Sequence, residues 1–105
     1  MEGCLYKNIQ TEKYYLLNTV AYYNSIVVDL ETFNSCFIQH DDLSNNYEKI
    51  EFNSNNLKQL LDKYIDFKNR VDYDNLNDFN YIKYDNIVYN IKNWYDVLNF
   101  IASQV

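Results

Sequence analysis

The chain has no proline, one glycine at position 3, two alanines and one arginine among its 105 residues. It therefore cannot form a glycine-rich loop that cradles a phosphate group. Its turns must be made by Asn, Asp and Ser, whose side chains favour turn conformations. In contrast, Phe, Tyr, Met, Ile, Asn and Lys, which A/T-rich codons encode, supply 53 residues. This bias indicates an A/T-rich genome, such as that of a low-GC bacterium, a phage, a virus or a mobile element.

Positive charge is scarce, and the net charge is −6. Residues 1–52 carry eight acidic residues against three lysines, a net −5, whereas residues 53–105 carry seven acidic and six basic residues, a net −1. A protein that binds a phosphate backbone needs clustered cations, so we do not expect direct nucleic-acid binding. An acidic surface could instead occupy the basic groove of a nucleic-acid-handling protein.

Length and hydropathy predict a single small globular domain over residues 1–105. No apolar run approaches the roughly 20 residues that span a bilayer, and Glu2 stands where a secretory signal would be basic. The two cysteines, Cys4 and Cys36, are too few for a disulfide framework. We therefore expect no membrane association and a cytoplasmic location, in the host cytoplasm if the gene is viral.

From residue 11 to residue 39, apolar residues recur every three or four positions, which is the period of an α-helix. The stripe consists of Leu16, Val20, Tyr23, Val27, Leu30, Phe33 and Phe37. This pattern favours one long helix or two consecutive helices. The β-prone run Ile26-Val27-Val28 and the paired tyrosines keep strands open as the alternative. A polar loop is predicted over 40–46, followed by a short strand over 47–52.

The second half of the chain carries clearer local signals. Residues 53–55 can cap a helix whose apolar stripe runs to Val71. Two β-prone runs, 81–84 and 87–91, flank Asp85-Asn86 and predict a hairpin. Asn93, with Asp96 three residues later, indicates the start of a final helix. The predicted fold class is helix-rich α+β, with one or two N-terminal helices, a central helix, a C-terminal hairpin and a last helix. The alternative is all-α.

Two groups of residues are candidates for partner binding. The acidic group lies within residues 29–51, where Lys49 alone opposes it, and comprises Asp29, Glu31, Asp41, Asp42, Glu48 and Glu51. It is either a phosphate-mimicking surface or the solvated side of a helix and its loop. The aromatic group is Tyr15 and Tyr22, which would share an outer face of a helix. It is either a surface for a partner or a second copy of the chain, or a product of codon bias.

Catalytic chemistry has little support. Cys36 and His40 are four residues apart and would share a helix face, as in a zinc site or a thiolate nucleophile. Structural zinc needs four ligands, however, and a single His leaves no ordinary triad. We expect no enzyme activity, no metal and no cofactor.

These observations favour a small acidic, non-enzymatic protein-binding module encoded by a phage, virus or mobile element. It would inhibit a host protein, with CRISPR and restriction effectors as candidate targets. One alternative is a regulatory or nucleic-acid-associated module, which requires the lysines of the second half to converge on one face. The other is an immunity protein against a toxin. Homodimerisation also stays open.

Overall fold

The computed structural model describes residues 3–64, 81–84 and 87–104. The chain divides into two compact units, Met1–Glu51 and Phe52–Val105, and the prediction of a single domain stays a prediction. The first unit contains β1 (Leu5–Asn8), β2 (Tyr14–Val20), β3 (Asn24–Asp29), β4 (Ser35–Gln39), α1 (His40–Asn46) and β5 (Tyr47–Ile50). The second contains α2 (Ser54–Tyr64), β6 (Tyr81–Tyr84), β7 (Ile87–Asn90) and α3 (Trp94–Ser103).

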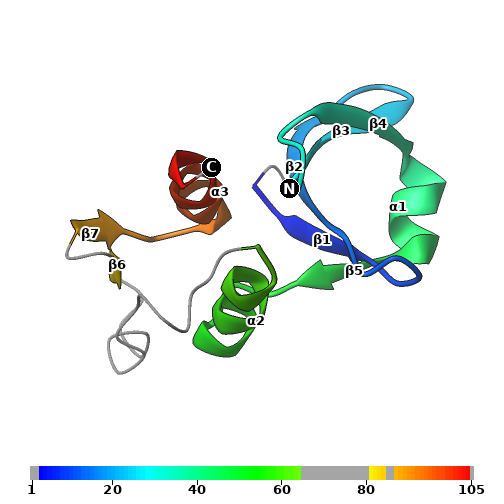
Figure 1. The fold of residues 1–105 in the computed structure, drawn as a ribbon. Helices are drawn as coiled ribbons and strands as arrows, with labels where there is room; N and C mark the ends of the chain where they lie inside the picture. The colour runs from blue at the N-terminus through cyan, green and yellow to red at the C-terminus, as the bar shows by residue number, and fades with distance from the viewer. Residues whose placement is uncertain (1–2, 65–80, 85–86, 105) are drawn as a thin grey trace. The chain divides into compact units, whose positions relative to one another are not determined.

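The first unit is an antiparallel five-stranded sheet in the order β4-β3-β2-β1-β5. The sheet curls strongly, and α1 connects its two edge strands across the open side (Figure 1). Inside the curl, Leu17, Val27, Ile38 and Leu43 form a buried cluster. Cys4, Tyr6, Tyr15, Cys36 and Tyr47 pack around it. The core of this unit is therefore the concave face of the sheet, covered by Leu43 of α1.

The prediction of one or two helices over residues 11–39 was wrong, and so were the helix-rich and all-α fold classes. This segment forms β2, β3 and β4, and a five-stranded sheet dominates the first unit. In β3, buried Ser25, Val27 and Asp29 alternate with less buried neighbours, as expected for a strand.

A β-bulge explains why the sequence pattern misled. The register between β2 and β3 shifts between Leu17 and Thr19. Both Leu16 and Leu17 are buried, so β2 lacks the simple alternation that identifies a strand. The remaining spacings of three and four arose from separate strands and turns, not from one helix.

Residues 40–46 form α1 and not the predicted loop, because Leu43 can enter the core from a helix. The predicted strand at 47–52 is confirmed as β5, which ends at Ile50. The lack of glycine has a structural consequence in the turns. Glu12 and Phe33 adopt left-handed conformations with φ of 61° and 60°, at a cost of about 1–2 kcal/mol each.

In the second unit, the predicted central helix is confirmed as α2 up to Tyr64, and its continuation to Val71 lies outside the described residues. The side chain of Asn53 accepts a hydrogen bond from the backbone N–H of Asn56 at 2.9 Å. Leu57, Leu60 and Leu61 form the buried stripe of the helix. An N-terminal cap and an apolar stripe thus define this helix, as the sequence indicated.

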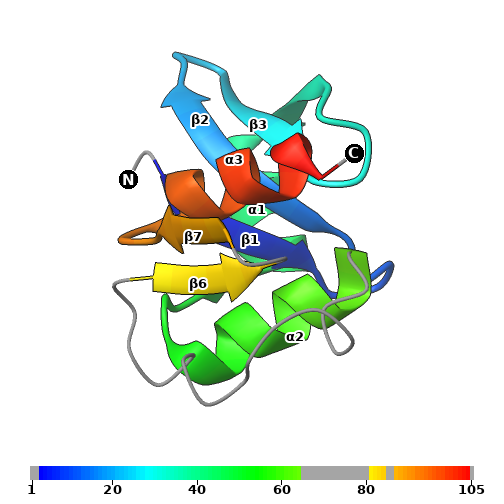
Figure 2. The ribbon, with the colours of Figure 1, turned by 60° about the vertical axis from the view of Figure 1, so that its left-hand side comes forward.

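The predicted hairpin is confirmed with its register. Tyr84 pairs with Ile87 and Ile82 with Tyr89, while the turn at 85–86 lies outside the described residues. The final helix is also confirmed, since Asn93 accepts a hydrogen bond from the Asp96 N–H at 3.0 Å. Figure 2 shows α3 next to the hairpin. The ring centroid of Phe100 on α3 lies 5.4 Å from that of Tyr84 and 4.6 Å from that of Tyr89.

Candidate functional site

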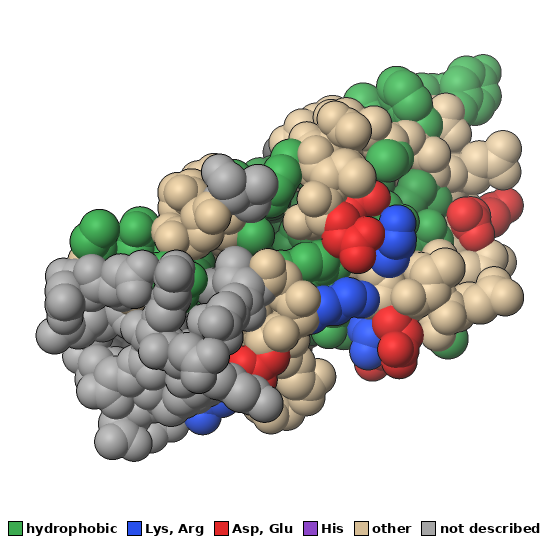
Figure 3. Space-filling model, viewed as in Figure 1, with side chains coloured by type: hydrophobic (Ala, Val, Ile, Leu, Met, Phe, Trp, Pro, Cys, Tyr) green, Lys and Arg blue, Asp and Glu red, His purple; other side chains and the backbone are tan. Residues whose placement is uncertain are grey.

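Three exposed aromatic side chains mark one end of the first unit. Tyr22 and Tyr23 lie in the turn between β2 and β3, and Phe37 lies on β4; their side chains are 86%, 77% and 74% exposed. The Tyr22 and Tyr23 rings meet edge to face, with centroids 4.6 Å apart. Hydrophobic side chains gather at the surface at this end of the sheet (Figure 3). We call these three residues the aromatic tip.

The strand register connects the aromatic tip to a groove. Asn24 pairs with Gln39 and Ile26 with Phe37, so Gln39 and Phe37 lie on the same face of β4. A groove of about 450 Å³ includes Gln39 of this face and is lined by Tyr22, Tyr23, Asn24, Gln39, His40 and Asp41. The two tyrosines of the tip thus share a groove with polar side chains and with one acidic residue, Asp41.

His40, the first residue of α1, fixes the position of the β2–β3 turn. Its Nε2 lies 3.0 Å from the carbonyl oxygen of Ala21, and its Nδ1 lies 3.3 Å from the hydroxyl of buried Ser25. A carbonyl only accepts, so Nε2 carries a hydrogen and donates it to Ala21. Nδ1 forms the second hydrogen bond, with the Ser25 hydroxyl. Both ring nitrogens are therefore engaged in holding the turn against α1.

Cys36 and His40 do not share the helix face on which the sequence pattern placed them. Cys36 lies on β4 and packs against the core cluster, while His40 begins α1, so the two residues are not on one helix. Cys4 and Cys36 are both free thiols. Within the ranges that the structure describes, no group of three or more His, Cys, Asp or Glu side chains could hold a metal ion.

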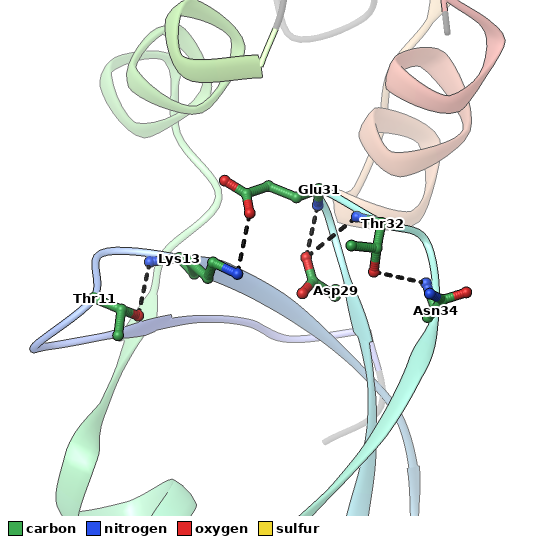
Figure 4. A network of polar contacts seen from close by, with 6 residues as sticks. All are labelled: Thr11, Lys13, Asp29, Glu31, Thr32 and Asn34. Carbon is green, nitrogen blue, oxygen red and sulfur yellow. Dashed lines mark hydrogen bonds and ion pairs between the residues drawn. The ribbon is translucent and has the colours of Figure 1, made fainter.

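Two of the six predicted acidic residues lie at the far end of β3. Asp29 is buried, and its Oδ1 accepts hydrogen bonds from the backbone N–H groups of Glu31 at 2.7 Å and Thr32 at 3.4 Å (Figure 4). Glu31 forms an ion pair with Lys13 at 3.2 Å, and this hydrogen bond and charge raise the pKa of the lysine. Asp29 and Glu31 therefore build and brace the β3–β4 turn.

The other four acidic residues are exposed. Asp41 and Asp42 lie in the first turn of α1, and the carboxylate of Asp42 accepts a hydrogen bond from the side chain of Asn46. Glu48 lies on β5, where it pairs with Lys7 of β1, and Glu51 follows that strand.

The six acidic residues are thus not all brought together. The length of β3 from Asn24 to Asp29, roughly 17 Å at about 3.3 Å per residue, separates the α1 end of the sheet from the Asp29 end. Of the six, only Asp41 lines the groove at the aromatic tip. Their role in partner binding stays a prediction.

Tyr15 and Tyr22 do not share the outer face that a helix would have given them. Tyr15 is half-buried on β2, and its ring meets that of Tyr47 edge to face at 5.7 Å. Burial, followed by the nearby negative charge of Asp29, raises the pKa of Tyr15. Only Tyr22 belongs to the aromatic tip.

Sequence reasoning placed Tyr23 and Phe37 in the core. The sequence signal that could have identified Tyr23 as a surface residue is Asn24-Ser25, which marks a turn after a β-prone run.

The structural role of Asp29 can be tested by two substitutions. Asp29→Ala removes the acceptor for two backbone N–H groups and should lower the free energy of unfolding by about 1–3 kcal/mol. Asp29→Asn keeps an oxygen at the same place and should cost clearly less. Urea denaturation of both variants measures the difference. Equal stability of the two variants would contradict this role.

Comparison with protein-family models, curated proteins and solved structures finds no match to this chain. None of the described helices is long and apolar enough to cross a membrane.

Proposed function

We propose that this chain is a non-enzymatic protein-binding module whose contact surface is the aromatic tip. The observation that carries the proposal is the exposure of Tyr22, Tyr23 and Phe37, of which the two tyrosines line one groove. Exposed aromatic clusters with a polar rim are typical of protein interfaces, because large rings bury much area at little entropic cost. The strands that carry the tip are paired in the sheet, and His40 forms a hydrogen bond with the turn that carries the two tyrosines. The backbone of the contact surface therefore loses little conformational freedom on binding.

The charge of the first unit indicates a basic partner. Residues 14–48 contain no lysine or arginine, and within this stretch Asp41 lines the groove and Asp42 follows it on α1. Charges at the rim of an interface steer association and discriminate between partners. A nucleic acid would be repelled, so the favoured partner is a protein with a basic surface.

Among basic proteins, we propose a host protein that handles nucleic acid, which this module would inhibit by occupying its basic groove. The acidity of the first unit and the A/T-rich origin of the gene support this partner class. The free thiols of Cys4 and Cys36 support a reducing compartment, the cytoplasm, as the place where it acts.

The proposal is tested by a tagged pull-down from a lysate of an A/T-rich bacterial host, washed at low and high salt, with bound species identified by mass spectrometry. The expected result is capture of one protein in stoichiometric amount, with less of it retained in the high-salt wash because salt weakens charge-driven binding. Recovery of nucleic acid, or of the bait alone, would contradict the proposal.

Charge reversal at the groove should weaken this binding. Asp41→Lys is expected to slow association with a basic partner by about tenfold at low salt, because rim charges act mainly on the association rate. Surface plasmon resonance at several salt concentrations measures the effect. Asp62→Lys, on the exposed side of α2, makes the same change in net charge and is the matched control. If both variants slow association equally, net charge alone matters and the groove has no special role.

A further inference from the structure

We infer that the groove at the aromatic tip takes a cationic side chain, an arginine or a lysine of the partner, over the Tyr22 and Tyr23 rings and beside Asp41. This inference rests on the proposed function and names the chemistry that the same site recognises. The occupant is a side chain of a protein, because the proposed partner is a protein with a basic surface and Asp41 lines the groove.

The two tyrosines supply the first half of the recognition. Their rings are nearly perpendicular, at 82°, and the two side chains are 86% and 77% exposed, so ring surface is accessible to a ligand. An aromatic face attracts a cation through its quadrupole. The chain itself uses this interaction, since the Nζ of Lys7 lies 5.8 Å from the ring centroid of Tyr14.

Asp41 supplies the second half. Its exposed carboxylate lies in the lining of the same groove, where it can pair with the charge that the rings attract. The groove lining lies within residues 14–48, a stretch that contains no lysine or arginine. Among the lysines of the first unit, Lys13 pairs with Glu31 and Lys7 lies over Tyr14. The inferred cation therefore belongs to the partner.

The two amide side chains of the groove favour a guanidinium group, which presents several N–H donors in one plane. Asn24 and Gln39 face each other across β3 and β4, and their amide oxygens can accept hydrogen bonds from a guanidinium group. Both ring nitrogens of His40, which also lines the groove, are engaged with Ala21 and Ser25. It acts as a positioning residue that holds the turn carrying the two tyrosines.

The test is an NMR titration of the full, isotopically labelled chain with N-acetyl-arginine amide. The matched neutral ligand is N-acetyl-citrulline amide, which keeps the shape and loses the charge. We expect saturable shifts at residues 21–24 and 39–41 with the arginine compound, and much smaller ones with citrulline. Equal shifts with both compounds, or no localised shift with arginine up to its solubility limit, would overturn the inference.

Variants make the test specific. The Tyr22→Ala and Tyr23→Ala double variant should abolish the localised shifts, and Asp41→Asn should weaken the arginine affinity about two- to fivefold, as expected for an exposed ion pair. Asp41→Glu keeps the charge and should retain most of the affinity. An arginine affinity that is unchanged in Asp41→Asn would also overturn the inference.

The outcome can be separated from that of the proposed function. If the pull-down captures a partner through the tyrosines while arginine and citrulline bind alike, only the inferred cation recognition fails. If the double tyrosine variant captures the partner as well as the unmodified chain does, the proposed interface itself fails.

Discussion

Replacing both Tyr22 and Tyr23 by alanine is expected to weaken partner binding by at least about thirtyfold. An interface hot spot contributes about 2 kcal/mol or more on truncation, and 1.4 kcal/mol corresponds to tenfold in affinity. Both rings are more than three-quarters exposed and contact each other, so their removal takes away the largest accessible aromatic area of the first unit. Surface plasmon resonance with the captured partner measures the loss.

The free energy of unfolding should change little in this variant, because exposed side chains contribute little to packing. Ile87→Ala and Val88→Ala form the matched control, since both residues are large, apolar and exposed on β7 of the second unit. The control should bind normally. A similar loss of binding in both double variants would mean that exposed apolar area in general, and not the aromatic tip, contacts the partner.

The second large effect concerns the core of the first unit. Leu17→Ala is expected to lower the free energy of unfolding by about 2–5 kcal/mol, the cost of truncating a buried leucine. Leu17 is 2% exposed and packs with Val27, Ile38 and Leu43 inside the curled sheet. Since small domains are stable by only about 5–15 kcal/mol, this loss is a large share of the total. Urea denaturation followed by far-UV circular dichroism measures it.

Val20→Ala, on the same strand, is the matched control for Leu17→Ala. Val20 is 51% exposed, so its truncation should cost less than about 0.5 kcal/mol. The helical interpretation of residues 11–39 reverses this order, because it places Val20 on the apolar stripe and Leu17 off it. A larger loss in Val20→Ala than in Leu17→Ala would therefore contradict the strand and favour the helix.

The elements of the second unit could be predicted because their signals are local. Asn53 and Asn93 cap their helices through hydrogen bonds that span three residues. The hairpin register follows from a two-residue turn and from the alternation of the flanking residues. In each case the residues that decide the structure lie within one turn of one another.

The candidate site could be predicted only in part. The sequence singled out Tyr22 and Asp41, which both line the groove. It also grouped Asp29 with the acidic surface, whereas the folded chain uses this carboxylate to close a turn. Phe37 could not be found as a surface residue, because an apolar aromatic in a helical spacing is ordinarily a core residue.

The sequence by itself determined the absence of phosphate loops, the negative charge of the first half, the turn-forming role of Asn and Asp, and the locally capped helices. Only the tertiary structure decided that residues 14–39 form strands. Their pairing depends on partners elsewhere in the chain, such as Leu16 with Leu5 of β1 and with Val28 of β3. Strand preference comes from packing against neighbours that are remote in sequence, so a period of three or four within one segment cannot decide it. The same long-range pairing turns Tyr22 and Tyr23 out to solvent and sets them beside Asp41.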